Sequence, residues 1–161
     1  MLRIDPCKGA GIVAHSWRNR SRGGMPWHLR WKPVCASTES VLSDWLRDKP
    51  FLENQPRAFI AARQTHGRGQ RGKVWHSPEG GVWISAAIPW SKQNNSACLM
   101  GLAVAVALAE RLENCSVPVK IKWPNDLLVD GRKLAGLLPS LIHRGGKIRL
   151  ARIGLGLNVR N

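Results

Sequence analysis

One stretch, GRGQRGKVWHSPEGG at residues 67–81, constrains the fold more than any other part of the chain. Its first six residues match G-x-G-x-x-G, the glycine pattern of a dinucleotide-binding turn. Such a turn opens a helix, and an acidic residue follows about 20 residues later. Here Pro78 and the glycines after it interrupt any helix, and positions 85–100 hold no acidic residue. We therefore predict a loop at residues 65–81 and exclude a dinucleotide-binding Rossmann fold.

The cations of this loop favour an anionic ligand. Arg68, Arg71 and Lys73 stand among its glycines, and no acidic residue lies between Glu53 and Glu79. Glycines let backbone N–H groups approach phosphate oxygens, and guanidinium groups bind such oxygens in pairs. A solvated basic loop would show the same composition, so the loop alone leaves phosphate binding and plain solvation as alternatives.

The pattern around the loop predicts helices first and an antiparallel meander afterwards. A helix is predicted over residues 37–49, capped by Ser37 or Thr38 and ended by Pro50, with one apolar face formed by Val41, Leu42, Trp45 and Leu46. A second helix over residues 96–114 is apolar almost all round until Glu110, which predicts that it is largely buried.

Strands are predicted at residues 57–64 and 82–89, then at 119–123 together with 125–130, and at 133–143 and 147–159. The tetrapeptides DGRK (130–133) and RGGK (144–147) have the turn chemistry of hairpins. The fold class is therefore α/β (α+β), with a mixed, largely antiparallel sheet packed against helices.

Composition narrows the class of partner and the compartment. The 25 Lys and Arg residues exceed the 10 Asp and Glu residues, and the net charge of +15 favours anionic partners. Four cysteines without a C-x-x-C pattern argue against a zinc site and for a reducing, cytoplasmic location. The longest apolar run, residues 97–109, is too short to cross a membrane. Residues 1–26 are predicted to form a flexible basic arm rather than a targeting peptide.

A second motif, KWPND at residues 122–126, lies between two predicted strands. If Lys122 faces a core, its charge requires an anionic partner, because an unpaired buried charge is costly. If Lys122 is exposed, the motif is only a structural turn. Spacing alone leaves both alternatives open.

The combination of motifs resembles the catalytic domain of biotin–protein ligases. The segments that carry the resemblance, in order, are STE (37–39), RQTHGRGQRGKVWHSPEGGVWIS (63–85), KWPNDLLVDGRKLAGLL (122–138) and GLGLNV (154–159). The resemblance implies a synthetase-like catalytic domain at residues 27–161 that is incomplete at its C-terminus, because the family continues into a small β-barrel. It implies ATP, biotin and Mg²⁺ as substrates and activating ion. It also implies the biotin carboxyl carrier domain of acetyl-CoA carboxylase as acceptor, with neither a specific nucleic acid nor a membrane as partner.

The resemblance also implies roles for single residues. Lys122 would contact the biotin carboxylate and the α-phosphate, while Arg68 and Arg71 would hold phosphate and close over the adenylate. The implied biotin-binding residues are Ser37, Thr38, Glu39, Gln64, Gly67, Arg68, Gly69, Gln70, Lys122 and Gly136. The implied nucleotide-binding residues are Arg68, Arg71, Trp75, Asn125 and Asn158, and no residue is assigned as a metal ligand.

Two residues depart from the family pattern. Glu39 stands where members often have Asn, and Gln70 stands where several have Arg, which weakens the expected hold on the adenylate. Two alternatives remain beside the ligase interpretation. One is a basic nucleic-acid-binding module, favoured by the net charge, and the other is an inactive ligase remnant.

Overall fold

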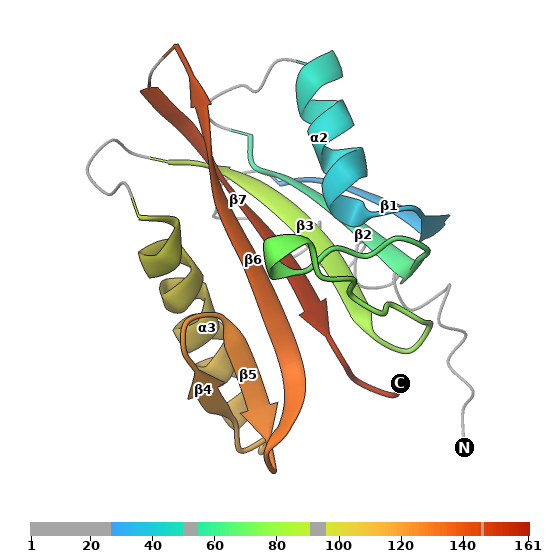
Figure 1. Ribbon diagram of the computed structural model, residues 1–161, viewed down its shortest axis with the longest axis vertical. Coiled ribbons are helices and arrows are strands. Elements are labelled where there is room, and N and C mark those ends of the chain that lie inside the picture. The colour runs from blue at the N-terminus through green and yellow to red at the C-terminus, as the bar shows by residue number, and fades with distance from the viewer. Residues whose placement is uncertain (1–26, 50–54, 91–95, 146) are drawn as a thin grey trace.

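The computed structural model describes residues 27–49, 55–90, 96–145 and 147–161. Within these ranges the chain forms one seven-stranded mixed sheet with the strand order β1-β2-β3-β7-β6-β5-β4 (Figure 1). The elements in chain order are β1 His28–Cys35, α2 Thr38–Asp48, β2 Arg57–Gln64, η1 Gln70–Gly72, β3 Val82–Pro89, α3 Ala97–Glu113, β4 Lys120–Lys122, β5 Asp126–Val129, β6 Arg132–Arg144 and β7 Lys147–Leu157. The predicted fold class is confirmed. The predicted arm at residues 1–26 and the stop at Pro50 lie outside the described residues.

The sheet is mixed because one of its strand pairs is joined by a helical crossover. β1 and β2 are parallel, because α2 carries the chain back between them, and the other pairs are antiparallel. Asp130 and Gly131, with φ of 50° and 75°, adopt the left-handed backbone that a tight hairpin between β5 and β6 requires. Gly145, with φ of 59°, closes the hairpin between β6 and β7 in the same way. Both predicted hairpins are confirmed.

The two helices cover opposite faces of the sheet. α2 buries Leu42, Trp45 and Leu46 against side chains of β2, β3 and β7. α3 packs Ala105 and Ala109 against β5 and β6 through residues that alternate with those facing α2. The half of the α2 face that α2 leaves open, over β3, β7 and β6, is covered by the loop at residues 65–81 (Figure 1).

The prediction that the second helix is largely buried was wrong. Only Met100, Gly101, Ala105 and Ala109 of α3 are buried, while Leu99 and Val106 are 53% and 40% exposed. The reason is that α3 lies on the outside of a two-layer arrangement, and the described residues provide no further layer over it. None of the helices in the described ranges is long and apolar enough to cross a membrane.

Candidate functional site

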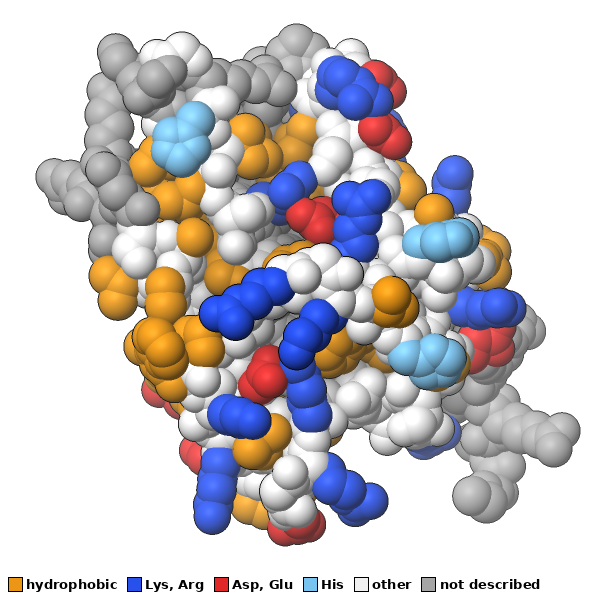
Figure 2. All heavy atoms as spheres, viewed as in Figure 1, with side chains coloured by type: hydrophobic (Ala, Val, Ile, Leu, Met, Phe, Trp, Pro, Cys, Tyr) orange, Lys and Arg blue, Asp and Glu red, His pale blue; other side chains and the backbone are white. Residues whose placement is uncertain are grey.

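A cavity of about 370 Å³ opens between the start of α2, the loop at residues 65–81 and the strands β3, β5, β6 and β7. A volume of this order suits a small-molecule ligand. In the space-filling view, Lys and Arg side chains gather around the loop that covers the sheet (Figure 2). The predicted site residues that line the cavity are Ser37, Thr38, Glu39, Gln64, Arg68, Gly69, Gln70, Arg71, Trp75, Asn125 and Gly136. Gly67, Lys122 and Asn158 do not line it.

The loop folds back on itself to form the cavity's outer wall. The Gly69 N–H donates to the Lys73 carbonyl at 2.8 Å, and the Trp75 N–H donates to the Gly67 carbonyl at 2.9 Å. At the tip, the short helical turn η1 includes Arg71 with a φ of 55°. A Cβ at Gly67 would lie 2.3 Å from the Trp75 carbonyl oxygen, so this close return requires glycine there. Gly67 therefore shapes the loop from outside the cavity.

The cavity wall carries an excess of positive charge. Its two acidic side chains are each paired, Glu39 with Arg152 at 2.8 Å and Asp126 with Lys133 at 2.8 Å. Arg68, Arg71 and Lys73 also line the cavity, and no acidic side chain of the described residues forms an ion pair with them. These three cations are available to an anionic ligand.

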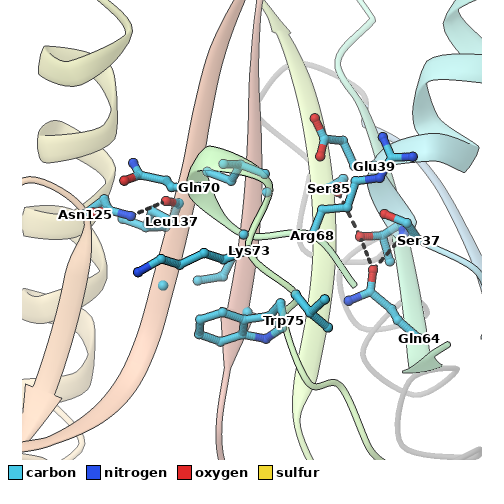
Figure 3. Close-up of a pocket in the computed structure, with 18 of the residues that line it drawn as sticks. Ser37, Glu39, Gln64, Arg68, Gln70, Lys73, Trp75, Ser85, Asn125 and Leu137 are labelled. Atoms are coloured by element: carbon cyan, nitrogen blue, oxygen red, sulfur yellow. Dashed lines mark hydrogen bonds between the residues drawn. The ribbon is translucent and has the colours of Figure 1, made fainter. Parts of the chain in front are cut away.

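At the α2 end of the cavity the polar side chains form an ordered chain of hydrogen bonds (Figure 3). The Gln64 Oε1 atom accepts from Thr38 N at 2.7 Å and from Thr38 Oγ1 at 3.1 Å. The Gln64 Nε2 atom donates to Ser77 Oγ at 2.8 Å, and Ser77 Oγ donates to the Trp75 carbonyl at 3.2 Å. Gln64 thus supplies the cap at the start of α2. The predicted side-chain cap from Ser37 is absent in the structure, and Thr38 is itself the first residue of α2, where its hydroxyl donates to Gln64.

These hydrogen bonds determine which atoms face a ligand as donors and which face it as acceptors. The single hydroxyl hydrogen of Thr38 is directed to Gln64, so in the 2.8 Å contact between Thr38 Oγ1 and Ser85 Oγ the donor is Ser85. Ser85 therefore offers lone pairs to the cavity, whereas Gln64 has only an Nε2 hydrogen left to offer. A neighbouring acceptor and donor complement an amide or a cyclic urea.

The opposite end of the cavity has a glycine floor. Gly136 and Gly156 are register partners on β6 and β7, and the Trp75 ring lies over both. A Cβ at Gly136 would be 2.8 Å from Trp75 Cζ3, and one at Gly156 would be 2.5 Å from Trp75 Nε1. The Lys133 Nζ atom lies 4.7 Å from the centre of the ring. The Trp75 ring therefore packs the loop against the sheet next to Lys133.

Replacement of Gly156 by alanine is expected to displace Trp75 from this floor. The added methyl group would overlap the half-buried indole, and such overpacking costs about 1–3 kcal/mol of unfolding free energy. Urea denaturation of the wild type and the variant measures this loss. Gly154→Ala is the matched control, because a Cβ there meets its nearest atom, Leu138 Cβ, at 3.4 Å. Equal stability of the two variants would contradict the proposed packing.

The structure separates the two lysines of the second motif. Lys122 is exposed on the edge strand β4. Of the two alternatives left open by the sequence, the structure therefore shows the exposed lysine. Its register partner is Asp126, so its side chain is on the cavity face but outside the cavity lining. Lys133, which was not among the candidates, lines the cavity between Asp126 and Trp75. In the sequence, the one feature that could have pointed to Lys133 is its position in GRKLAG, inside a segment that carries the family resemblance.

Two predicted nucleotide-binding residues are engaged with the main chain. Asn125 Nδ2 donates to the Leu137 carbonyl at 2.8 Å, and the Leu137 N–H donates to the Asn125 carbonyl at 2.8 Å. Asn158 Nδ2 donates to the Lys133 carbonyl at 3.0 Å. These contacts hold β6, and with it Lys133, in place.

The described residues contain no group of three or more His, Cys, Asp or Glu side chains that could hold a metal ion. Cys35, at the end of β1, is no activated nucleophile, because burial raises the pKa of its thiol and Lys32 lowers it by less. The chemistry of the site therefore depends on hydrogen-bonding groups and cations.

The cavity has a polar, amide-like end and a cationic end on a mixed sheet, so its chemistry suits a small ligand with an anionic part. Comparison with known proteins identifies the class. The model of the biotin/lipoate A/B protein ligase family matches residues 33–158, and the chain belongs to this family.

Two relatives and one solved structure illustrate the similarity. The bifunctional ligase/repressor BirA of Bacillus subtilis is 33% identical over 139 residues, which are 84% of this chain and 41% of BirA. The biotin–[acetyl-CoA-carboxylase] ligase of Paracoccus denitrificans is 31% identical over 130 residues, 78% of this chain and 53% of the relative. The biotin protein ligase of Aquifex aeolicus in complex with biotin and ATP superposes with a TM-score of 0.66 at 28% identity, covering 83% of this chain and 54% of that one. The chain thus spans about half of their length.

Proposed function

We propose that the chain is an ATP-dependent biotin–protein ligase. In the first step a carboxylate oxygen of biotin attacks the α-phosphorus of ATP, the bond to pyrophosphate breaks, and biotinyl-5′-AMP remains bound. In the second step the amine of an acceptor lysine attacks the acyl carbon, an amide forms and AMP leaves. The acceptor is the biotin carboxyl carrier domain of acetyl-CoA carboxylase, and the reaction takes place in the cytoplasm. The names of the Paracoccus and Aquifex proteins support these substrates.

The observation that carries this proposal is the polarity of the cavity. Ser85 and Gln64 offer an acceptor and a donor at one end, which suits the cyclic urea of biotin. Arg68, Arg71, Lys73 and Lys133 line the same cavity. A carboxylate and a polyphosphate can approach each other only where such cations offset their repulsion. Mg²⁺ would enter with the phosphates of ATP, since the described residues offer it no ligand cluster.

We assign the central role in adenylation to Lys133. Its ammonium group lines the cavity, whereas Lys122 is exposed at the edge of the sheet. Asp126 and the Trp75 ring hold Lys133 at its position, so a transferring phosphate would meet a preorganised charge. The role of Lys122 stays a prediction from the resemblance, and its place on the cavity face allows it to contact a ligand that extends to β4.

Biotin-dependent exchange of pyrophosphate into ATP tests the proposal on the purified chain. The assay needs no acceptor protein, so it reports the first step alone. Exchange that disappears when biotin is omitted is the expected result. A folded chain that binds biotin or ATP without exchange would indicate an inactive remnant. A chain that binds neither, but binds DNA or RNA with a steep salt dependence, would indicate the nucleic-acid module.

Arg68→Ala is expected to shorten the lifetime of the bound adenylate about tenfold or more, because a charged hydrogen bond to phosphate contributes about 1.5–3 kcal/mol. The side chain lines the cavity without an acidic partner among the described residues, so its charge is available to the ligand. Release of labelled adenylate from the preformed complex measures the lifetime. Arg47→Ala, which removes a charge from the exposed end of α2, is the control. Equal lifetimes for both variants would contradict the role of the loop.

A further inference from the structure

The ion pair between Glu39 and Arg152 is the feature of the cavity that the ligase chemistry does not explain. Glu39 lies in the first turn of α2 and lines the cavity. Arg152 lies on β7, and its Nη2 atom is 2.8 Å from Glu39 Oε1. The same guanidinium donates to Ser43 Oγ at 2.6 Å and to Ser140 Oγ at 3.1 Å. Arg152 and Glu39 are largely buried, with 21% and 17% of their side-chain surfaces exposed. The contacts with Glu39, Ser43 and Ser140 hold the guanidinium of Arg152 from three sides.

A carboxylate at this position opposes the binding of an anion. Glu39 and Arg68 line the same cavity, and Figure 3 shows the Arg68 side chain extending toward the side of the cavity where Glu39 lies. An unpaired carboxylate there would repel phosphate and would attract the guanidinium of Arg68. At an effective dielectric constant between those of water and protein, one charge at about 7 Å changes an anion's affinity by roughly three- to tenfold.

We propose that Arg152 is a positioning residue that holds the carboxylate of Glu39 against β7 and thereby leaves Arg68 free for the anionic part of the ligand. Arg152 does not line the cavity, so it acts through Glu39 and not by contact with the ligand. The proposal concerns the anion-binding end of the site and rests on the proposed function only for the identity of that anion. A purely structural role, in which the pair merely ties α2 to β7, makes a different prediction.

Replacement of each partner and of both separates the two roles. The probe is inorganic pyrophosphate, whose dissociation constant is measured by calorimetry on the full chain. Arg152→Gln is expected to weaken binding by about three- to tenfold, because Glu39 loses its partner. The double variant Arg152→Gln/Glu39→Gln is expected to recover to within about twofold of the wild type, because the repelling charge is gone. A structural tie would not be rescued, since the double variant lacks the tie as well.

Two further variants keep the test decisive. Arg152→Lys retains the charge and is expected to keep most of the affinity even if Arg152→Gln folds poorly. Arg47→Gln removes one positive charge from the exposed pair with Asp44 and controls for net charge. The inference is overturned if the double variant binds no better than Arg152→Gln, or if the wild type binds no pyrophosphate. The proposed function fails separately, if the variants follow the expected order but the wild type shows no biotin-dependent exchange.

Discussion

Lys133→Ala is expected to reduce biotin-dependent pyrophosphate exchange by about a hundred- to a thousandfold. Removal of one preorganised group that stabilises developing charge has an effect of this order. The ammonium of Lys133 lines the cavity, pairs with Asp126 at 2.8 Å and lies over the Trp75 ring, so no other described cation has the same position. The measurement is the initial exchange rate at saturating ATP and biotin, after circular dichroism has shown that the variant is folded.

Lys122→Ala is the comparison that decides between the two lysines. The sequence resemblance predicts that it abolishes adenylate formation, whereas the exposed position of Lys122 predicts a smaller loss than for Lys133→Ala. Lys133→Arg keeps the charge but changes its geometry, and intermediate activity is expected. Full activity of Lys133→Ala beside an inactive Lys122→Ala would return the central role to Lys122.

The second large effect is on stability, and it concerns Trp83. This side chain is fully buried in β3, and its Nε1 atom donates to the carbonyls of Ala62 at 3.1 Å and Pro78 at 2.9 Å. Trp83→Ala is expected to lower the free energy of unfolding by about 3–5 kcal/mol, since it leaves a large cavity. It also leaves two carbonyl groups without their donor. Urea denaturation measures the loss.

Trp123→Ala provides the control, because this ring is 70% exposed and its removal is expected to change stability by about 0.5 kcal/mol or less. Trp83→Phe retains most of the buried volume and is expected to fall between the two. If Trp83→Ala were as stable as Trp123→Ala, the role of Trp83 as the link between β2 and the end of the loop would be wrong.

The fold could be predicted where one local signal dominated. The strands at residues 57–64 and 82–89 have the predicted bounds, because each is a short apolar run that stops at glycine- or proline-rich loop sequence. The hairpin at Asp130 and Gly131 follows from turn chemistry alone. By contrast, the apolar composition of α3 predicted burial on all sides, and composition cannot tell whether a second layer will cover a helix.

The site was harder to predict because its geometry depends on an irregular pairing. Strict alternation along β6 places Lys133 on the face of Ala135 and Leu137, which is buried against α3. A break in register between Leu127 and Leu128 moves Lys133 to the cavity face instead. The contact of Trp75 with the glycines of β6 and β7 joins segments about 60 and 80 residues apart and is not visible in any local pattern.

The position of β7 has a consequence for the order in which the molecule can assemble. β7 is the last strand in the described chain, yet it lies between β3 and β6 in the middle of the sheet. During synthesis, β1, β2 and β3 can therefore join the meander only once β7 has been made, and such non-local pairing slows folding. Ser85 belongs to the first group, whereas Gly154 and Gly156 belong to β7. A ligand that contacts both groups can consequently bind only after β7 has been inserted, so ligand binding reports the insertion of this strand.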